Sequence, residues 1–377
     1  MLLILAGVSI ATLTGENGIL TRANNAKENT EQAEEDELRK LTQAEAATYL
    51  EEHEYTDVSG ETVTIPAKCA VSQVEWENTL EDGLVIIDVN GNEWVWIEVP
   101  KTEMPEELTF INDSDYTTLE TALQTYTNIY RQSPFTDEWY SEDQDGLTQT
   151  EYNDLKKSML RSVYEHEGFF IGRYEVGSFD NPVTANDTTR KAVIQKGAYP
   201  YNYITCNQAQ KLAESFAIEE KNSSLMFGIQ WDLVLKYLEI NGKWDTSNHE
   251  ASYYLKTDSS LWGNYRDSEF VVLKGNKMQH IINYRLEQWN DVSENYSKPS
   301  YDTAGYGVLL STGATERNKK MNIYDLAGNV IEWSLEKSNK IDSPCSSRGG
   351  YCTYTGSITP ASYRNVGDVL VSAYSLG

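Results

Sequence analysis

The residues best suited to chemistry lie in one short segment, 325–333, which reads Asp-Leu-Ala-Gly-Asn-Val-Ile-Glu-Trp. Its Asp, Asn and Glu side chains supply hard oxygen atoms, and calcium takes about six to eight such ligands, backbone carbonyls included. Gly328 allows the tight turn that would gather them. Alternatively, Asn329 and Glu332 hydrogen-bond the loop backbone and are buried with Trp333. The segment therefore predicts either a metal site or a structural polar turn.

Thiol and imidazole groups offer less chemistry. The chain has four cysteines and four histidines: Cys69, Cys206, Cys345, Cys352, His53, His166, His249 and His280. Cys345 and Cys352 lie seven residues apart around a predicted turn and could form a disulfide bond, but the sequence does not fix the geometry that such a bond needs. The histidines show no ligand-like spacing, which argues against a zinc or iron site built from several of them.

The composition limits the classes of partner. The net charge is −27, from 58 acidic and 31 basic residues, and no basic cluster occurs. Because phosphate binding needs a basic face, we expect no nucleic-acid partner. The chain has 25 Tyr and 9 Trp against 8 Phe, a balance that suits binding surfaces. The plainer interpretation is that these tyrosines lie half-buried on the surface of a loop-rich fold.

The amino-terminal region predicts a helix and a stalk. Residues 1–14 are apolar but too short to span a bilayer, which needs about 20 residues. Residues 1–33 resemble the second half of the amino-terminal helix of Gram-positive type IV pilin-like proteins, so we expect a truncated membrane or pilus anchor. A short buried helix at the start of a soluble protein is the alternative. Residues 34–82 predict a helical stalk or linker followed by short strands.

The remaining elements must position the 325–333 segment. Two β-rich runs flank Asn90-Gly91 within residues 83–100, which predicts a hairpin with a type I′ turn and with Trp94 and Trp96 on one face. Helices are expected near 116–131 and 150–164, inside a helical insertion over 112–165. Residues 168–177 predict a core strand that ends in a buried charge pair or a capped Glu. Further helices are expected over 207–219 and from about 228. The class is therefore α+β.

Three motifs in order carry a family resemblance: residues 322–333, then Arg-Gly-Gly-Tyr at 348–351, then Pro-Ala-Ser-Tyr-Arg at 360–364. Together they resemble the formylglycine-generating enzymes, the sulfatase-modifying-factor branch of the C-type-lectin-like fold. The resemblance implies one loop-rich domain of this fold over 83–377. It also implies a structural calcium near the turn, with Asp325 and Glu332 as the side-chain ligands.

The resemblance does not extend to the family's catalytic ligands. The enzymes bind copper through two cysteines five positions apart after the Arg-Gly-Gly block, whereas here Ser357 follows Cys352 at that distance and Cys345 precedes the block. A single thiolate cannot provide the two-coordinate soft site that copper(I) prefers. The histidine triad of the related iron-dependent sulfoxide synthases has no counterpart either. We therefore expect neither copper nor iron, and a non-catalytic protein rather than an enzyme.

The carboxy-terminal residues favour binding. Residues 351–377 are rich in Tyr, Ser, Thr, Asn, Ala and Gly, a composition that resembles that of an antibody paratope. The fold is also that of variable proteins diversified by retroelements, in which adenine-directed mutagenesis alters residues of this region. That resemblance implies the following ligand-binding candidates: Tyr351, Thr353, Tyr354, Ser357, Tyr363, Asn365, Asp368 and Tyr374.

These observations predict a surface-displayed binding protein. We expect its ligand to be a protein or glycan on another cell, a phage or a host surface, and its location to be a bacterial, Gram-positive-like cell surface, anchored to the membrane or a pilus. An oxidoreductase with an altered metal site and a minor pilin are the alternatives. Family members continue with a last apolar strand after Gly-Phe-Arg, and its loss would leave an open sheet edge.

Overall fold

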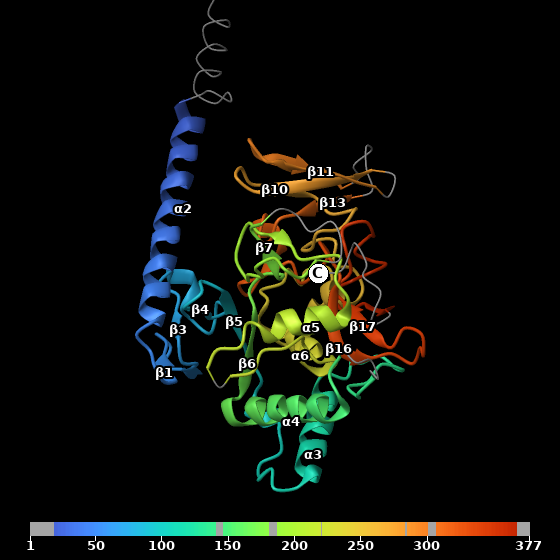
Figure 1. The fold of residues 1–377 in the computed structure, drawn as a ribbon. Helices are drawn as coiled ribbons and strands as arrows, with labels where there is room; N and C mark the ends of the chain where they lie inside the picture. Colours follow the sequence, from blue (N-terminus) through green and yellow to red (C-terminus); the bar gives the residue numbers. More distant parts are fainter. Residues whose placement is uncertain are drawn as a thin grey trace, which may run out of the picture.

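The computed structural model describes residues 19–140, 146–180, 187–219, 221–282, 285–300 and 307–367. Its helices are α2 (Ile19–Ala46), α3 (Asp113–Tyr126), α4 (Gln149–His166), α5 (Cys206–Glu214), α6 (Gly228–Asn241) and α7 (Ala251–Lys256), with short 3₁₀ helices at Glu75–Glu77, Lys101–Glu103 and Glu316–Asn318. Together with the strands described next they form an α+β fold (Figure 1), as predicted. The observed elements do not by themselves test the finer expectation of a C-type-lectin-like fold.

The strands form several small sheets, and their ladders within the described ranges are antiparallel. The largest sheet has the order β3-β4-β5-β6, from β3 (Cys69–Val71), β4 (Val85–Asp88), β5 (Glu93–Glu98) and β6 (Gly168–Gly172). Three-stranded sheets have the orders β16-β17-β18, from Glu332–Lys337, Cys345–Arg348 and Arg364–Gly367, and β11-β10-β13, from Arg285–Asp291, Lys277–Ile282 and Gly307–Leu310. Strand pairs join β1 (His53–Thr56) to β2 (Thr62–Ile65), β7 (Gly177–Ser178) to β8 (Tyr199–Pro200), β9 (Phe270–Val272) to β12 (Tyr296–Lys298), and β14 (Lys319–Lys320) to β15 (Ile323–Tyr324).

The amino-terminal helix is tied to the large sheet. The last turns of α2 pack beside β3 and β4 (Figure 1), and the Arg39 guanidinium reaches Glu77 with an N–O distance of 2.7 Å. Residues 1–18, the apolar part of the expected anchor, lie outside the described residues. Strand β3 pairs with β4 across the boundary that we expected at residue 83. The stalk region thus contributes a strand to the sheet of the following domain.

The hairpin at Asn90-Gly91 is confirmed, but its predicted type I′ turn is wrong. Gly91 has a φ of +80°, whereas Asn90 is not among the residues with positive φ, and a type I′ turn requires both. The Asp88 carboxylate closes the turn instead, because it accepts hydrogen bonds from the N–H groups of Asn90 (2.7 Å) and Asn92 (3.0 Å). An Asp side chain that holds its own turn removes the need for a second left-handed residue.

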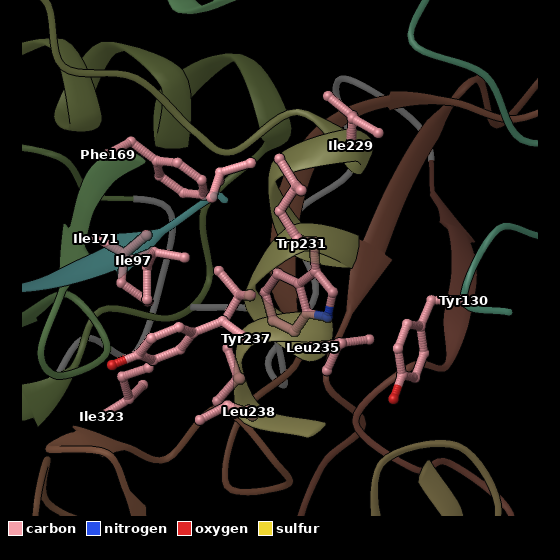
Figure 2. Close-up of a cluster of buried hydrophobic side chains, with 14 of the residues drawn as sticks. Ile97, Tyr130, Phe169, Ile171, Ile229, Trp231, Leu235, Tyr237, Leu238 and Ile323 are labelled. Atoms are coloured by element: carbon pink, nitrogen blue, oxygen red, sulfur yellow. The ribbon is translucent and has the colours of Figure 1, made fainter. Parts of the chain in front are cut away.

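The main core lies between the large sheet and α6. Figure 2 shows Trp231 and Leu235 of α6 among side chains of β5, β6 and β15, including Ile97, Phe169 and Ile323. Trp231 is fully buried, and its indole N–H donates to the Ala361 carbonyl at 3.1 Å. Helix α6 therefore connects the core to the carboxy-terminal segment.

Several helices lie where the sequence predicts them. Helices α3 and α4 match the expected helical insertion and lie together at one end of the molecule, opposite the β10-β11-β13 sheet (Figure 1). Thr148 is the N-cap of α4 and Thr205 is the N-cap of α5. Each forms a capping box in which its hydroxyl accepts a hydrogen bond from the backbone N–H of the third helical residue. Helix α5 ends at Glu214 rather than near residue 219.

Candidate functional site

A buried cluster of ion pairs fixes both ends of the carboxy-terminal segment. Arg348 ends β17 and Arg364 begins β18, and both contact Asp232 of α6 and Glu336 of β16. The Asp232 oxygens lie 2.8 Å from each guanidinium, and the carboxylate has no exposed surface. Arg131 adds a third guanidinium at 3.0 Å from Asp232. The chain from 349 to 363 is therefore a loop closed by a buried clasp, which we define as Arg348, Arg364, Asp232 and Glu336.

Sequence reasoning missed this clasp. Arg348 and Arg364 belong to the motifs that we noted, but their buried role was not predicted. Asp232 lies between the apolar residues Trp231 and Leu233 of α6, and that contrast was the available signal. A buried charge needs partners, so an acidic residue among apolar neighbours indicates an ion pair. Its arginine partners come from distant parts of the chain and cannot be identified by spacing.

Hydrogen bonds to the loop backbone also fix its position. The Tyr265 hydroxyl donates to the Gly349 carbonyl at 2.9 Å, and the Cys352 N–H donates to the Asn329 carbonyl at 3.2 Å. Gly350 has a φ of +73°, and a Cβ there would lie 2.1 Å from the Thr359 carbonyl oxygen. The loop therefore has a fixed path, and its side chains project in fixed directions.

The predicted binding residues and the anchoring residues separate by exposure. The six candidates in the described range are all at least partly exposed: Tyr351, Thr353, Tyr354, Ser357, Tyr363 and Asn365. Interleaved with them are buried residues that hold the loop: Cys352, Thr355, Thr359, Ala361 and Arg364. Asp368 and Tyr374 lie outside the described residues. We call the six partly exposed residues the tyrosine face.

Aromatic side chains form the centre of this face. The rings of Tyr351 and Tyr354 meet edge to face with their centroids 4.9 Å apart. Partial burial raises the pKa of Tyr351 to about 12. Burial also raises the pKa of Tyr363, and the neighbouring Tyr354 adds to that shift. All three tyrosines of the face thus lie in one neighbourhood, where their rings offer apolar contact and Tyr351 and Tyr363 stay protonated at neutral pH.

The segment 325–333 forms a polar turn that the protein itself satisfies. Asp325 is buried and accepts hydrogen bonds from the Gly313 N–H (2.7 Å) and the Asn318 amide (3.2 Å). The Asn329 amide oxygen accepts from the Leu310 N–H at 2.9 Å, and its nitrogen donates to Glu175 at 2.5 Å. These bonds support the interpretation of the segment as a structural turn.

The carboxyl groups near this turn bear on the calcium prediction. Burial raises the pKa of Asp325 to about 6 and that of Glu332 to about 8, and the Asp325 charge adds to the second shift. Glu175, expected at the end of a strand over 168–177 as part of a buried charge pair or as a capped Glu, lies beyond β6, which ends at Gly172. It accepts hydrogen bonds from the Asn329 amide and, at 3.1 Å, from the Val330 N–H. Within the described ranges no group of three His, Cys, Asp or Glu residues is placed to hold a metal ion. Protein donors engage both Asp325 oxygens, and calcium at Asp325 and Glu332 stays a prediction.

The cysteines are buried and unlinked. Cys345 and Cys352 are not joined by a disulfide bond, although the sequence allowed one between them. They pack in different apolar clusters, Cys345 beside Trp333 and Cys352 beside Val330. Burial raises the pKa of Cys352 to about 12. A metal-binding or nucleophilic cysteine needs its thiolate form, which this environment disfavours.

Comparison of the chain with family models, with curated proteins and with solved structures found no match. Among the helices in the described residues, none combines the length and the apolar character that a membrane crossing requires.

Proposed function

We propose that the chain is a non-catalytic binding protein that holds its ligand on the tyrosine face. One observation carries the proposal: between Arg348 and Arg364 the candidate side chains are accessible, while the intervening residues anchor the loop. Accessible tyrosines on a fixed backbone lose little conformational entropy when they bind. The ligand we propose is a protein or glycan on another cell, a phage or a host surface.

A retroelement-diversified variable protein is the sharper form of this proposal. Substitutions at exposed positions away from special contacts change stability by about 0.5 kcal/mol or less, so the exposed members of the face, Tyr354, Ser357 and Asn365, should tolerate many side chains. The buried clasp does not, because each arginine is paired with carboxylates. This contrast between exposed candidate positions and buried ion-paired positions supports the proposal.

DNA sequencing across many cells of one strain tests this form directly. We expect adenine-directed variation at the codons of the tyrosine face, and constancy at those of Arg348, Cys352 and Arg364. The codons of Asp368 and Tyr374 should vary as well. An invariant segment, or variation that falls equally on the clasp, would reject diversification.

A binding experiment tests the general proposal. The purified chain would be applied to a glycan array and to intact bacterial cells, next to a Tyr351→Ala/Tyr354→Ala variant. We expect the variant to lose binding while its thermal unfolding stays close to that of the native chain. Equal binding by both proteins would place the ligand elsewhere. A Tyr116→Ala/Tyr126→Ala variant, altered at two partly exposed tyrosines of α3 outside the face, provides the matched control.

We further propose that the protein is displayed at a bacterial surface through its amino-terminal region, in a membrane or a pilus. This follows the resemblance of residues 1–33 to pilin-like helices. A minor pilin is the alternative role, and incorporation of the chain into filaments would favour it. The oxidoreductase alternative predicts bound copper and oxidation of a cysteine peptide, and the burial of Cys352 speaks against it.

A further inference from the structure

A large cavity runs along the outer edge of β6. Its volume is about 560 Å³, within the range of ligand-binding clefts. Side chains from both faces of β6 line it, among them Phe169 and Phe170. Leu212 and Phe216 of the α5 region and Trp333 of β16 form other parts of its wall. The cavity therefore surrounds the strand edge rather than one face of the sheet.

The cavity reaches the protein surface. Two ion pairs lie in its lining, Lys221 with Glu52 at 2.7 Å and Arg161 with Glu165 at 2.7 Å. The side chains of the first pair are each 49% exposed. A ligand can therefore enter between charged side chains and reach an apolar interior.

The edge of β6 presents backbone groups without strand partners. In the sheet β3-β4-β5-β6, β6 pairs with β5 alone. Two backbone hydrogen bonds, from the Val99 N–H to the Glu167 carbonyl and from the Arg173 N–H to the Glu93 carbonyl, show which residue pairs of this ladder are hydrogen-bonded. By that alternation, the N–H and C=O groups of Gly168, Phe170 and Gly172 point away from β5. Within the described ranges no backbone or side-chain hydrogen bond meets them on that side.

Polar side chains also belong to the cavity wall. Glu332 and Tyr174 both line it, although the Tyr174 hydroxyl itself is buried away from the open space. Polar backbone groups in folded proteins are nearly always paired, so the unpaired edge of β6 beside an open cavity points to a hydrogen-bonding ligand.

We propose that an extended peptide segment of another polypeptide binds in this cavity and adds to β6 as a fifth strand. Only an extended main chain offers donors and acceptors at the repeat of alternate strand residues, about 7 Å. Its backbone would pair with Phe170 and Gly172, and alternate side chains, small and apolar, would contact the aromatic lining. This is peptide recognition by strand addition. The site is separate from the tyrosine face and goes beyond the proposed function.

The test uses a synthetic probe and the full chain. The probe is a fluorescent, N-acetylated octapeptide of alternating valine and threonine with a carboxy-terminal lysine. Its control has the same sequence with alternate amides N-methylated, which removes the donors that face β6. Fluorescence anisotropy should show saturable binding of the probe, and binding about tenfold or more weaker for the methylated peptide. Hydrogen exchange at Phe170 and Gly172 should slow when the probe binds.

Two serine variants locate the site. Ser224→Trp fills the cavity and should abolish probe binding, while Ser247→Trp lies outside its lining and should leave binding unchanged. Tyr354→Ala should also leave it unchanged, so this proposal and the proposed function can fail separately.

Three results would overturn the proposal. The first is absence of probe binding to the full chain, and the second is equal binding of the methylated peptide. The third is binding only by a chain cut after Gly367, because the protein would then fill the edge with its own residues.

Discussion

Replacement of Asp232 by Asn tests whether the buried clasp holds the carboxy-terminal loop. Asp232 has no exposed surface and contacts three guanidinium groups, those of Arg131, Arg348 and Arg364. The Asn side chain keeps the shape of Asp but removes its charge. The three arginines then share only the carboxylates of Glu336 and Asp137. Loss of one partner from a buried ion pair costs about 3–5 kcal/mol of the free energy of unfolding.

This cost converts into a measurable change in melting temperature. Unfolding entropy is about 2.1 cal/mol/K per residue, which gives about 0.8 kcal/mol/K for a chain of 377 residues. Asp232→Asn should therefore lower the melting temperature by about 4–6 °C. Differential scanning calorimetry of the two proteins at pH 7 would measure the change.

Asp82→Asn is the matched control for this experiment. Asp82 pairs with Lys243 at 2.7 Å, but their side chains are 40% and 61% exposed. Exposed ion pairs contribute about 0–1 kcal/mol, so this variant should shift the melting temperature by about 1 °C or less. If Asp232→Asn destabilised the protein no more than Asp82→Asn, the clasp would not be the anchor that we describe.

Three more measurements follow from the same region. Burial raises the pKa of Glu332 from 4.5 to about 8, so the stabilisation that its protonated form provides is full below pH 4.5 and is lost as the pH rises toward 8. The melting-temperature advantage of Glu332→Gln over the native chain should therefore grow from pH 5 to pH 8, and a constant difference would contradict this. Gly328→Ala should cost about 1–3 kcal/mol for strain at its φ of +81°, plus a clash 2.1 Å from the Asn264 carbonyl, and should unfold at lower temperature than Gly60→Ala, which has a similar φ and open space. EDTA, and calcium added after it, should leave the melting temperature unchanged, whereas a calcium-dependent rise of several degrees would restore the predicted metal site.

Local signals predicted the helices better than the pairing of distant segments. The expected helix over 150–164 is observed at Gln149–His166, because Thr148 and the apolar period of the helix are both readable in sequence. The type I′ turn failed because the Asp88 side chain supplied the hydrogen bonds that a second left-handed residue would have provided. The partnership of Arg364 with Asp232 joins positions 132 residues apart, and no local pattern encodes it.

The same contrast explains which part of the candidate site was predictable. The composition of residues 351–377 favoured a binding surface, the resemblance implied the individual residues of the tyrosine face, and their role in binding stays a prediction. Its support was not, because buried polar contacts depend on the three-dimensional path of the chain. The cavity beside β6 belongs to the same category, since an unpaired strand edge is a property of the sheet order and not of the strand's own sequence.

The clasp and the tyrosine face place buried ion pairs and exposed side chains on one loop. Arg348 ends β17 before the loop and Arg364 begins β18 after it, and both contact the same two carboxylates. Loop closure is therefore enforced by side chains that lie outside the loop's exposed positions. On the proposed function, substitutions at the exposed positions alter the ligand contacts and leave the buried ion pairs unchanged. A protein whose binding residues change would depend on this separation, which is why the clasp favours the diversified form of the proposal.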